Sequence, residues 1–183
     1  MVIVLITIAL QLLNSYVINS AFSYYRNDFL NKIYYLWITP NFVHLHWKHW
    51  FLNMLSFIST LLFFHNIWSI KELIGFFLGA SLFIMSSLYL FSTNVNSYVG
   101  MSGILYGLVF YGAMKSLVSH KITSTLILSF IVLKLFFNQE INHLMGVDSF
   151  LNYSVVVTDV HWYGVVFACL YLMKSLIHNT FTS

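Results

Sequence analysis

The sequence predicts an all-α integral membrane protein in which six helices cross the membrane. Apolar residues make up 60% of the chain and charged residues only 7%, whereas soluble domains carry roughly a quarter charged residues. The apolar residues form long runs that short polar stretches separate. Because one crossing needs about twenty apolar residues, 183 residues suffice for about six crossings. We therefore expect one membrane domain without a soluble appendage.

The six expected spans follow one another along the chain. The first run lacks a basic leading region and an obvious cleavage site, so we expect a retained span and not a removed signal. Residues 23–47 combine polar and aromatic side chains, which is typical of a membrane interface and predicts a long first loop. Polar residues predict two further loops at 92–101 and 138–154. The spans expected within the single domain 1–183 are about 1–22, 48–65, 70–91, 102–116, 121–137 and 155–174.

Charge indicates an orientation for this bundle. Six spans would place both termini on one side and the three longer loops on the other. Lysines and arginines divide equally between the two sides, but those on the terminal side cluster in very short turns, where the positive-inside rule counts best. We therefore expect cytoplasmic termini. The net charge of +3 comes without a basic cluster, which argues against a nucleic-acid partner, and the lone Cys169 is expected to be a free core thiol.

A serine between glycines opens the fourth expected span. Gly100 and Gly103 flank Ser102 closely, and glycine permits tight turns and close packing. At a helix N-terminus, free backbone N–H groups and the positive end of the dipole surround such a serine. These are the donors that an oxyanion needs after nucleophilic attack. The same pattern in an apolar chain is also typical of helix packing, so this motif alone leaves both interpretations open.

Polar residues of two other spans are expected at the same depth as Ser102. His49 and Asn53 begin the second span, and His161 lies near the start of the sixth. Such residues are costly inside a membrane and are usually functional or paired. A neutral His161 could take the serine proton and return it to a leaving amine. His49 and Asn53 share one side of a helix and can both donate hydrogen bonds to an oxyanion.

Small residues would let the fourth and sixth spans approach closely. Each span carries a pair of them four residues apart, as in small-xxx-small packing motifs. The pairs are Gly103 with Gly107 and Gly164 with Ala168. Tyr106, one turn after Ser102, could stack on His161 or simply pack. No third acid is evident, because Asp159 points to a different side of the helix from His161 and is expected to be a loop-end charge near water.

Together these motifs resemble those of the rhomboid family of intramembrane serine proteases. That family carries Gly-x-Ser-Gly on its fourth span, His-x-x-x-Asn on its second and His-x-x-Gly on its sixth. This sequence has them at 100–103, 49–53 and 161–164, in that order along the chain. The resemblance covers the chain from about Trp37 to its end and implies a six-transmembrane-helix rhomboid-like bundle.

The resemblance also implies roles for individual residues. Ser102 would be the nucleophile and His161 the base, while His49, Asn53 and the backbone N–H of Ser102 would line the oxyanion hole. A further set would support the site. It comprises Tyr106, which would stack on the catalytic imidazole, His44, which matches an upstream loop histidine, and the motif glycines Gly100, Gly103 and Gly164.

Finer details resemble one branch of the family, the rhombosortases. The similar segments are 39–44, 47–49, 98–103, 133–135 and 139–140, and the small six-span size fits as well. The branch implies cleavage of C-terminal Gly-Gly tail anchors of exported proteins, in the bacterial inner membrane, with the active site open to the periplasm. The implied partners are transmembrane or tail-anchored protein substrates and membrane lipid, and no cofactor or metal is implied. Tyr35 and Leu36 replace the family's Trp-Arg pair of the first loop, and Ala168 replaces a glycine.

Other classes of function remain open at this point. A non-catalytic rhomboid-like protein that binds membrane clients would be expected to lose the serine or the histidine, and both are present. A metal-dependent membrane enzyme could use His44, His46 and His49, but the sequence has no histidine box and no His-Glu-x-x-His motif. A transporter would need paired intramembrane charges, and the interior is poor in charges.

Overall fold

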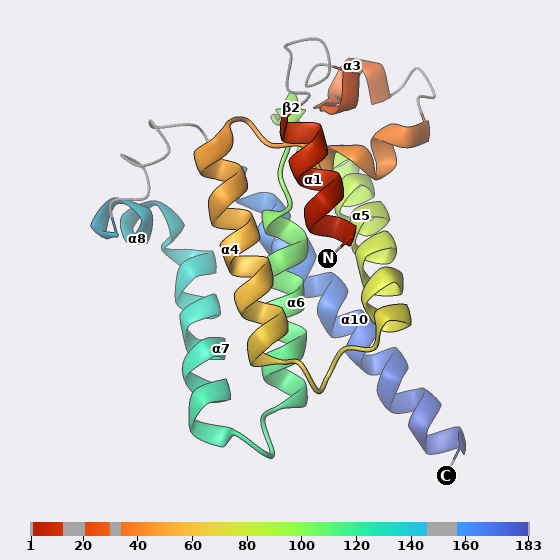
Figure 1. The fold of residues 1–183 in the computed structure, drawn as a ribbon, viewed down its shortest axis with the longest axis vertical. Helices are drawn as coiled ribbons and strands as arrows, with labels where there is room; N and C mark the ends of the chain where they lie inside the picture. The colour runs from red at the N-terminus through yellow and green to blue at the C-terminus, as the bar shows by residue number, and fades with distance from the viewer. Residues whose placement is uncertain (1, 13–20, 30–33, 146–156, 183) are drawn as a thin grey trace.

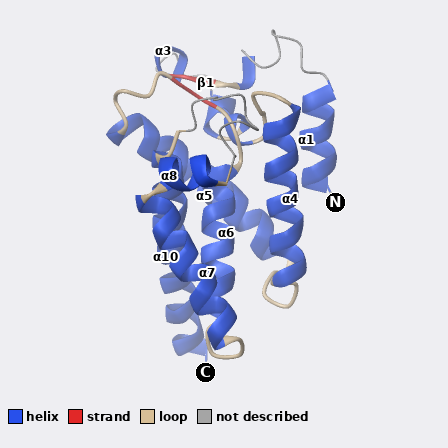
Figure 2. Ribbon diagram, turned by 90° about the vertical axis from the view of Figure 1, so that its left-hand side faces the viewer, coloured by secondary structure: helices blue, strands red, loops and turns tan. Residues whose placement is uncertain are grey.

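The computed structural model describes residues 2–12, 21–29, 34–145 and 157–182. Long helices stand side by side in a bundle (Figure 1), and the two short strands lie at one end of it together with the longer connections (Figures 1 and 2). We call this the loop end. The long helices are α1 (Val2–Leu12), α4 (Trp47–Phe63), α5 (Ile70–Phe91), α6 (Ser102–Lys115), α7 (Lys121–Phe136) and α10 (Asp159–Thr182).

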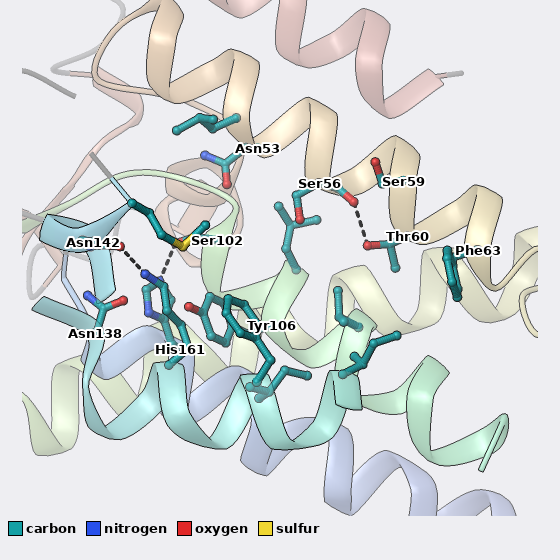
Figure 3. A pocket seen from close by; sticks show the side chains of 18 of the residues that line it. Asn53, Ser56, Ser59, Thr60, Phe63, Ser102, Tyr106, Asn138, Asn142 and His161 are labelled. Carbon is teal, nitrogen blue, oxygen red and sulfur yellow. Dashed lines mark hydrogen bonds between the residues drawn. The ribbon is translucent and has the colours of Figure 1, made fainter. Parts of the chain in front are cut away.

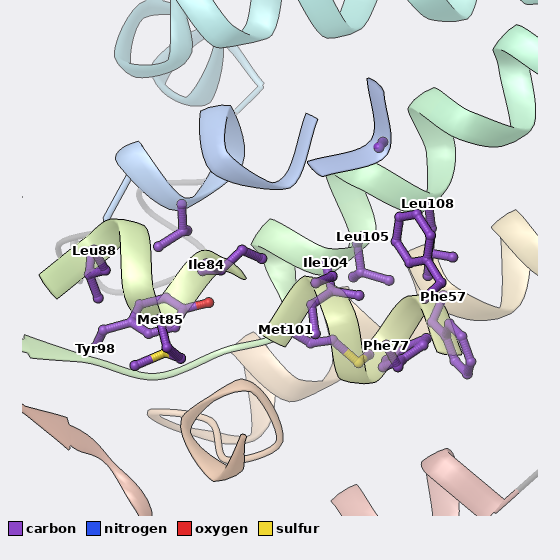
Figure 4. Close-up of a cluster of buried hydrophobic side chains, with 14 of the residues drawn as sticks. Phe57, Phe77, Ile84, Met85, Leu88, Tyr98, Met101, Ile104, Leu105 and Leu108 are labelled. Carbon is purple, nitrogen blue, oxygen red and sulfur yellow. The ribbon is translucent and has the colours of Figure 1, made fainter. Parts of the chain in front are cut away.

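Helix α6 is the central element of the bundle. It contacts α4, α5, α7 and α10, and its contact with α10 is the most extensive. Buried apolar side chains from α4, α5, α6 and the segment before α6 form the core around it (Figure 4). The fully buried members include Phe57, Phe76, Ile84, Met85, Leu88, Met101, Ile104 and Leu108. Ser102 therefore begins the helix that is most enclosed by its neighbours.

The first loop folds over the loop end. Its short elements are β1 (Tyr24–Tyr25), α3 (Arg26–Phe29) and two 3-10 helices at Tyr34–Trp37 and Thr39–Asn41. Strand β1 pairs in antiparallel fashion with β2 (Ser97–Tyr98), so that Tyr24 faces Tyr98. This pairing joins the first loop to the segment that precedes Ser102.

Most described helix bounds lie close to the expected spans, and the two differences are that α10 continues beyond residue 174 to Thr182 and that part of the expected loop at 138–154 is helical. Residues 1 and 13–20 of the expected first span, 146–154 of that loop and 155–156 of the sixth span lie outside the described residues. The prediction of a loop throughout 138–154 was wrong for its first part, where helix α8 (Asn138–Leu144) lies across the end of α7 (Figure 1). Asn138 and Asn142, four residues apart on this helix, share one face and are both buried.

Helix length limits how many membrane crossings can be assigned. Among the described residues, α5 is the one helix whose length and apolar composition suffice for a crossing, and Ile3–Leu12 is apolar but shorter. Helices α4, α6 and α7 have 17, 14 and 16 residues, fewer than the roughly twenty that span a bilayer. The number of spans therefore stays a prediction.

Candidate active site

The turn that carries Ser102 is held by contacts with the first loop. Gly100 has a φ of 121°, which favours glycine because it is a left-handed conformation. Its N–H donates to the carbonyl of Pro40 at 2.9 Å, and its carbonyl accepts from the hydroxyl of Tyr98. Ser102 is the first residue of α6, so its backbone N–H lacks a partner within the helix and lies at the positive end of the dipole.

His161 lies beside this serine in the first turn of α10. Its Nε2 is 3.1 Å from the hydroxyl oxygen of Ser102, and Figure 3 shows both side chains at one cavity. The ring of Tyr106 stacks on the imidazole, with 4.1 Å between centroids and 9° between planes. His161 is only 4% exposed, and its Nδ1 has no hydrogen-bond partner among the described residues. The arrangement is thus a Ser–His pair with a tyrosine against the imidazole.

Glycines explain why α6 and α10 approach so closely. A Cβ added at Gly107 would lie 2.6 Å from the carbonyl oxygen of Gly164, and one at Gly103 would lie 2.7 Å from the carbonyl oxygen of Val160. A Cβ at Gly164 would overlap the carbonyl group of Gly103. The two backbones therefore touch directly, which places Ser102 and His161 within hydrogen-bond distance. Ala168, which replaces a glycine of the family, is completely buried.

His49 and Asn53 lie on α4 on the other side of Ser102. The His46 side chain caps this helix by accepting from the N–H of His49 at 3.2 Å. The His49 ring packs against Gly100, where an added Cβ would lie 2.7 Å from its Cε1. Asn53 donates one amide N–H to the His49 carbonyl at 3.1 Å, and an amide has a second N–H to offer. Both side chains line the same cavity as Ser102.

His44 lies behind His49. It is 1% exposed, and its ring meets the His49 ring edge-to-face with 5.2 Å between centroids. Burial lowers the pKa of His44 to about 3, and the neighbouring His49 lowers this pKa as well. A neutral His44 therefore supports the His49 ring at neutral pH.

The cavity at Ser102 has a volume of about 680 Å³ and extends well beyond the serine. Its walls come from α4 on one side and from α7 and α8 on the other, and it continues along α4 as far as Phe63. His49 and Phe63 are fourteen positions apart on this helix, which corresponds to roughly 20 Å. Apart from a stripe of hydroxyl groups on α4, the deep part is apolar. The cavity can therefore take an extended apolar segment next to Ser102.

Three cavity residues were missed by the sequence analysis. Lys134, near the end of α7, and Asn138 and Asn142 of α8 line the cavity together with Ser102 and His161. The available signals were a lysine within an apolar run and two asparagines four residues apart. The asparagine spacing was not used, because a loop and not a helix was predicted over 138–154.

Two loop-end charges connect α5 to its neighbours. Asp159, expected to be a charge near water, accepts from the Ser92 hydroxyl at 2.5 Å, and that hydroxyl lies 2.8 Å from the hydroxyl of Tyr163. Arg26 of the first loop donates to the carbonyls of Tyr89 and Ser92 at 2.8 and 3.3 Å. The end of α5 is thus tied both to α10 and to the first loop.

Tyr35 and Leu36 occupy the positions of the family's Trp-Arg pair, and they are buried to different extents. Leu36 is 2% exposed and belongs to the hydrophobic core, while its neighbour Tyr35 is exposed. The first loop is therefore supported here by apolar burial and by Arg26.

Comparison with protein families gives a match over most of the chain. The family model described as the Rhomboid domain matches residues 31–173, a range that includes all three motifs and most of the described helices. A comparison with curated proteins gave no match. Because the family model covers more than half of the chain, this protein belongs to the rhomboid family, whose members are generally intramembrane serine proteases, and it is an integral membrane protein.

Proposed function

We propose that this protein is a serine endopeptidase that cleaves membrane-anchored proteins at or near a transmembrane segment. The observation that carries the proposal is the 3.1 Å separation of His161 Nε2 and the Ser102 hydroxyl oxygen, with Tyr106 stacked on the imidazole. A serine hydroxyl needs a base at about this distance to become a nucleophile. Membership of the rhomboid family supports the same reaction class.

The proposed reaction has two halves. In the first, Ser102 Oγ bonds to the scissile carbonyl carbon while His161 Nε2 takes the hydroxyl proton. The oxyanion accepts from the Ser102 N–H and from His49 and Asn53. The imidazolium then gives its proton to the leaving amine as the C–N bond breaks, which leaves an acyl group on Ser102. In the second half, water attacks this ester while His161 takes its proton and returns one to Ser102.

The cavity favours a substrate with little side-chain bulk at the cleavage site. The backbones of α6 and α10 touch below the pair, and the His49 ring packs on Gly100. A helical substrate must unwind to present its peptide bond here. Apart from proline, glycine is the residue that stabilises a helix least, so a helix unwinds most readily at glycine. We therefore propose C-terminal Gly-Gly tail anchors of exported proteins as the substrates, with the apolar tail lying in the deep part of the cavity between α4 and α7.

The proposed setting is the bacterial inner membrane. We propose six spans with cytoplasmic termini, which would open the loop end and its Ser–His pair to the periplasm. The lysines in the short turns of the opposite end support this orientation.

The test is co-expression with a secreted reporter that ends in Gly-Gly and an apolar helix. The wild-type chain should shorten the reporter at the Gly-Gly site, as mass spectrometry would show, and Ser102→Ala should leave it full length. A fluorophosphonate probe should label the wild-type protein at Ser102 and label His161→Ala weakly. Because the two residues act as one unit, the double variant should be no worse than either single one.

A matched control is Ser86→Ala. Ser86 lies on α5, outside the cavity, and its hydroxyl donates to the carbonyl of Leu82. This variant should cleave and label like the wild type. A reporter that binds the chain but is never cut, together with a wild type that never labels, would reject the protease and favour the client-binding alternative.

A further inference from the structure

The first turn of α10 is attached to the end of α5 by three polar side chains. The Ser92 hydroxyl donates to the carboxylate of Asp159 at 2.5 Å and lies 2.8 Å from the Tyr163 hydroxyl. Because a hydroxyl has only one proton to donate, Tyr163 is the donor in the second contact. Asp159 and Tyr163 are four residues apart and therefore lie on one side of α10. Both of them hold the same serine.

Ser92 is a fixed anchor for this attachment. It is only 2% exposed, and its N–H donates to the carbonyl of Leu88 at 3.1 Å. Its carbonyl accepts from the N–H of Val95 at 3.0 Å and from the guanidinium of Arg26 at 3.3 Å. Since every polar group of Ser92 is bonded, its position does not depend on α10 alone.

The other side of the same turn faces the nucleophile. His161 lies two residues after Asp159 and contacts Ser102, and the carbonyl of Val160 packs against Gly103. Three consecutive residues of α10 thus join two helices, because Asp159 is bonded to α5 while Val160 and His161 contact the start of α6. The imidazole Nδ1 has no partner among the described residues. The effect of Asp159 on His161 is therefore carried by the backbone between them.

We propose that Asp159 is a positioning residue for the Ser–His pair, whose hydrogen bond with Ser92 holds the first turn of α10 where His161 reaches Ser102. The proposal rests on the proposed protease function and adds a residue to its machinery. It also gives the first loop a part, because Arg26 holds the end of α5 to which Asp159 is attached. The Ser–His distance would then be set from two sides, by the glycine contact between α6 and α10 and by this bond to α5.

The test measures the rate constant and the endpoint of Ser102 labelling by a fluorophosphonate, with the purified full chain in detergent. Asp159→Leu removes the acceptor but keeps a side chain of comparable size. It should slow labelling roughly ten- to a hundredfold, because a misplacement of about 1 Å costs about a hundredfold in rate. Labelling should still run to completion, since the protein remains folded. Asp159→Asn keeps an oxygen that can accept from Ser92 and should recover most of the rate.

Ser92→Ala separates the hydrogen bond from the charge. This variant keeps the carboxylate at the start of α10 but removes its donor, so it should slow labelling to about the same extent as Asp159→Leu. The double variant should be no slower than the slower single one, because both changes break one bond. The matched controls are Asp28→Leu, at an exposed acid of the first loop, and Ser86→Ala, at a hydroxyl of α5 that donates to the carbonyl of Leu82. Both controls should label at the wild-type rate.

Several results would overturn the proposal. Wild-type rates in Asp159→Leu and Ser92→Ala would reject it while leaving the protease function intact. A lower endpoint at an unchanged rate constant would show a loss of folded protein and thus a structural role only. Equal slowing by Asp159→Asn and Asp159→Leu, with Ser92→Ala unaffected, would mean that the carboxylate acts by its charge and not through Ser92. A wild type that neither cuts nor labels would instead reject the proposed function itself.

Discussion

Gly164→Ala should separate the serine from the histidine without touching either of them. The Cβ that this substitution adds would overlap the carbonyl group of Gly103 and lie 2.7 Å from its carbon. Ordinary contact begins at 3.4 Å, and the obstacle is backbone of the neighbouring helix, which cannot rotate away. Helices α6 and α10 must therefore separate by at least about 0.7 Å to relieve the carbon contact alone.

The consequence for the Ser–His pair can be worked out from this shift. The 3.1 Å between His161 Nε2 and the Ser102 hydroxyl oxygen would grow to about 3.8 Å or more, which is beyond a hydrogen bond. Misplacement by about 1 Å costs roughly a hundredfold in rate. Overpacking should also lower the free energy of unfolding by about 1–3 kcal/mol, against a gain of up to about 1 kcal/mol from replacing a helical glycine.

The assay is the rate of labelling of Ser102 by a fluorophosphonate, followed beside the thermal unfolding midpoint in detergent. Gly164→Ala should label about a hundredfold more slowly and unfold at a lower temperature. Gly75→Ala on α5 is the matched control, because a Cβ there meets only the Tyr171 hydroxyl at an ordinary 3.7 Å. The control should label normally and unfold at the same or a slightly higher temperature. A Gly164→Ala protein with wild-type labelling would refute the claim that backbone contact sets the Ser–His distance.

Three other perturbations test separate parts of the structure. His49→Ala and Asn53→Ala should each slow reporter cleavage by roughly two to three orders of magnitude without unfolding the protein, as the loss of single oxyanion donors does; an unaffected Asn53→Ala with chelator-sensitive activity would favour a metal enzyme. Because the pKa of His44 is lowered to about 3 in the folded protein from about 6.5 in the unfolded chain, the unfolded chain binds the extra proton as pH falls from about 6.5 towards 3, and stability should fall over this range. Unfolding midpoints at pH 7 and 5 should differ less in His44→Gln than in the wild type, and equal differences would contradict this assignment. A reporter enzyme that works only in the cytoplasm should be active when it is fused after Lys174, and one that works only in the periplasm should be inactive there. Activity of the periplasmic reporter would reverse the proposed orientation.

Local signals in the sequence were sufficient for the long helices and for the Ser–His pair at the ends of two of them. Helix α5 runs over Ile70–Phe91 as expected, because an uninterrupted apolar run follows a capping box in which Ser69 and Glu72 exchange hydrogen bonds. The depth shared by Ser102 and His161 followed from where their apolar runs begin. Glycines at small-xxx-small spacing indicated that these two helices could touch.

Contacts between distant segments could not be predicted in this way. The strands β1 and β2 have two residues each, too few for any alternating pattern, and their pairing joins positions more than seventy residues apart. The same holds for Arg26, whose carbonyl partners lie at the end of α5. Helix α8 was missed because its seven residues, NQEINHL, are mostly polar and form no long apolar run.

Among the described residues no acid lies next to the imidazole, which gives Tyr106 a larger part in the proposed mechanism. In a triad, a carboxylate at Nδ1 orients the ring and stabilises the imidazolium that forms on proton transfer. No described side chain does this for His161. The Tyr106 ring lies parallel to the imidazole at 4.1 Å, which fixes the plane of the ring and lies within the range of about 6 Å over which an aromatic face attracts a cation. Because the face is electron-rich, the attraction appears when His161 becomes charged, which is the stage at which the reaction needs it.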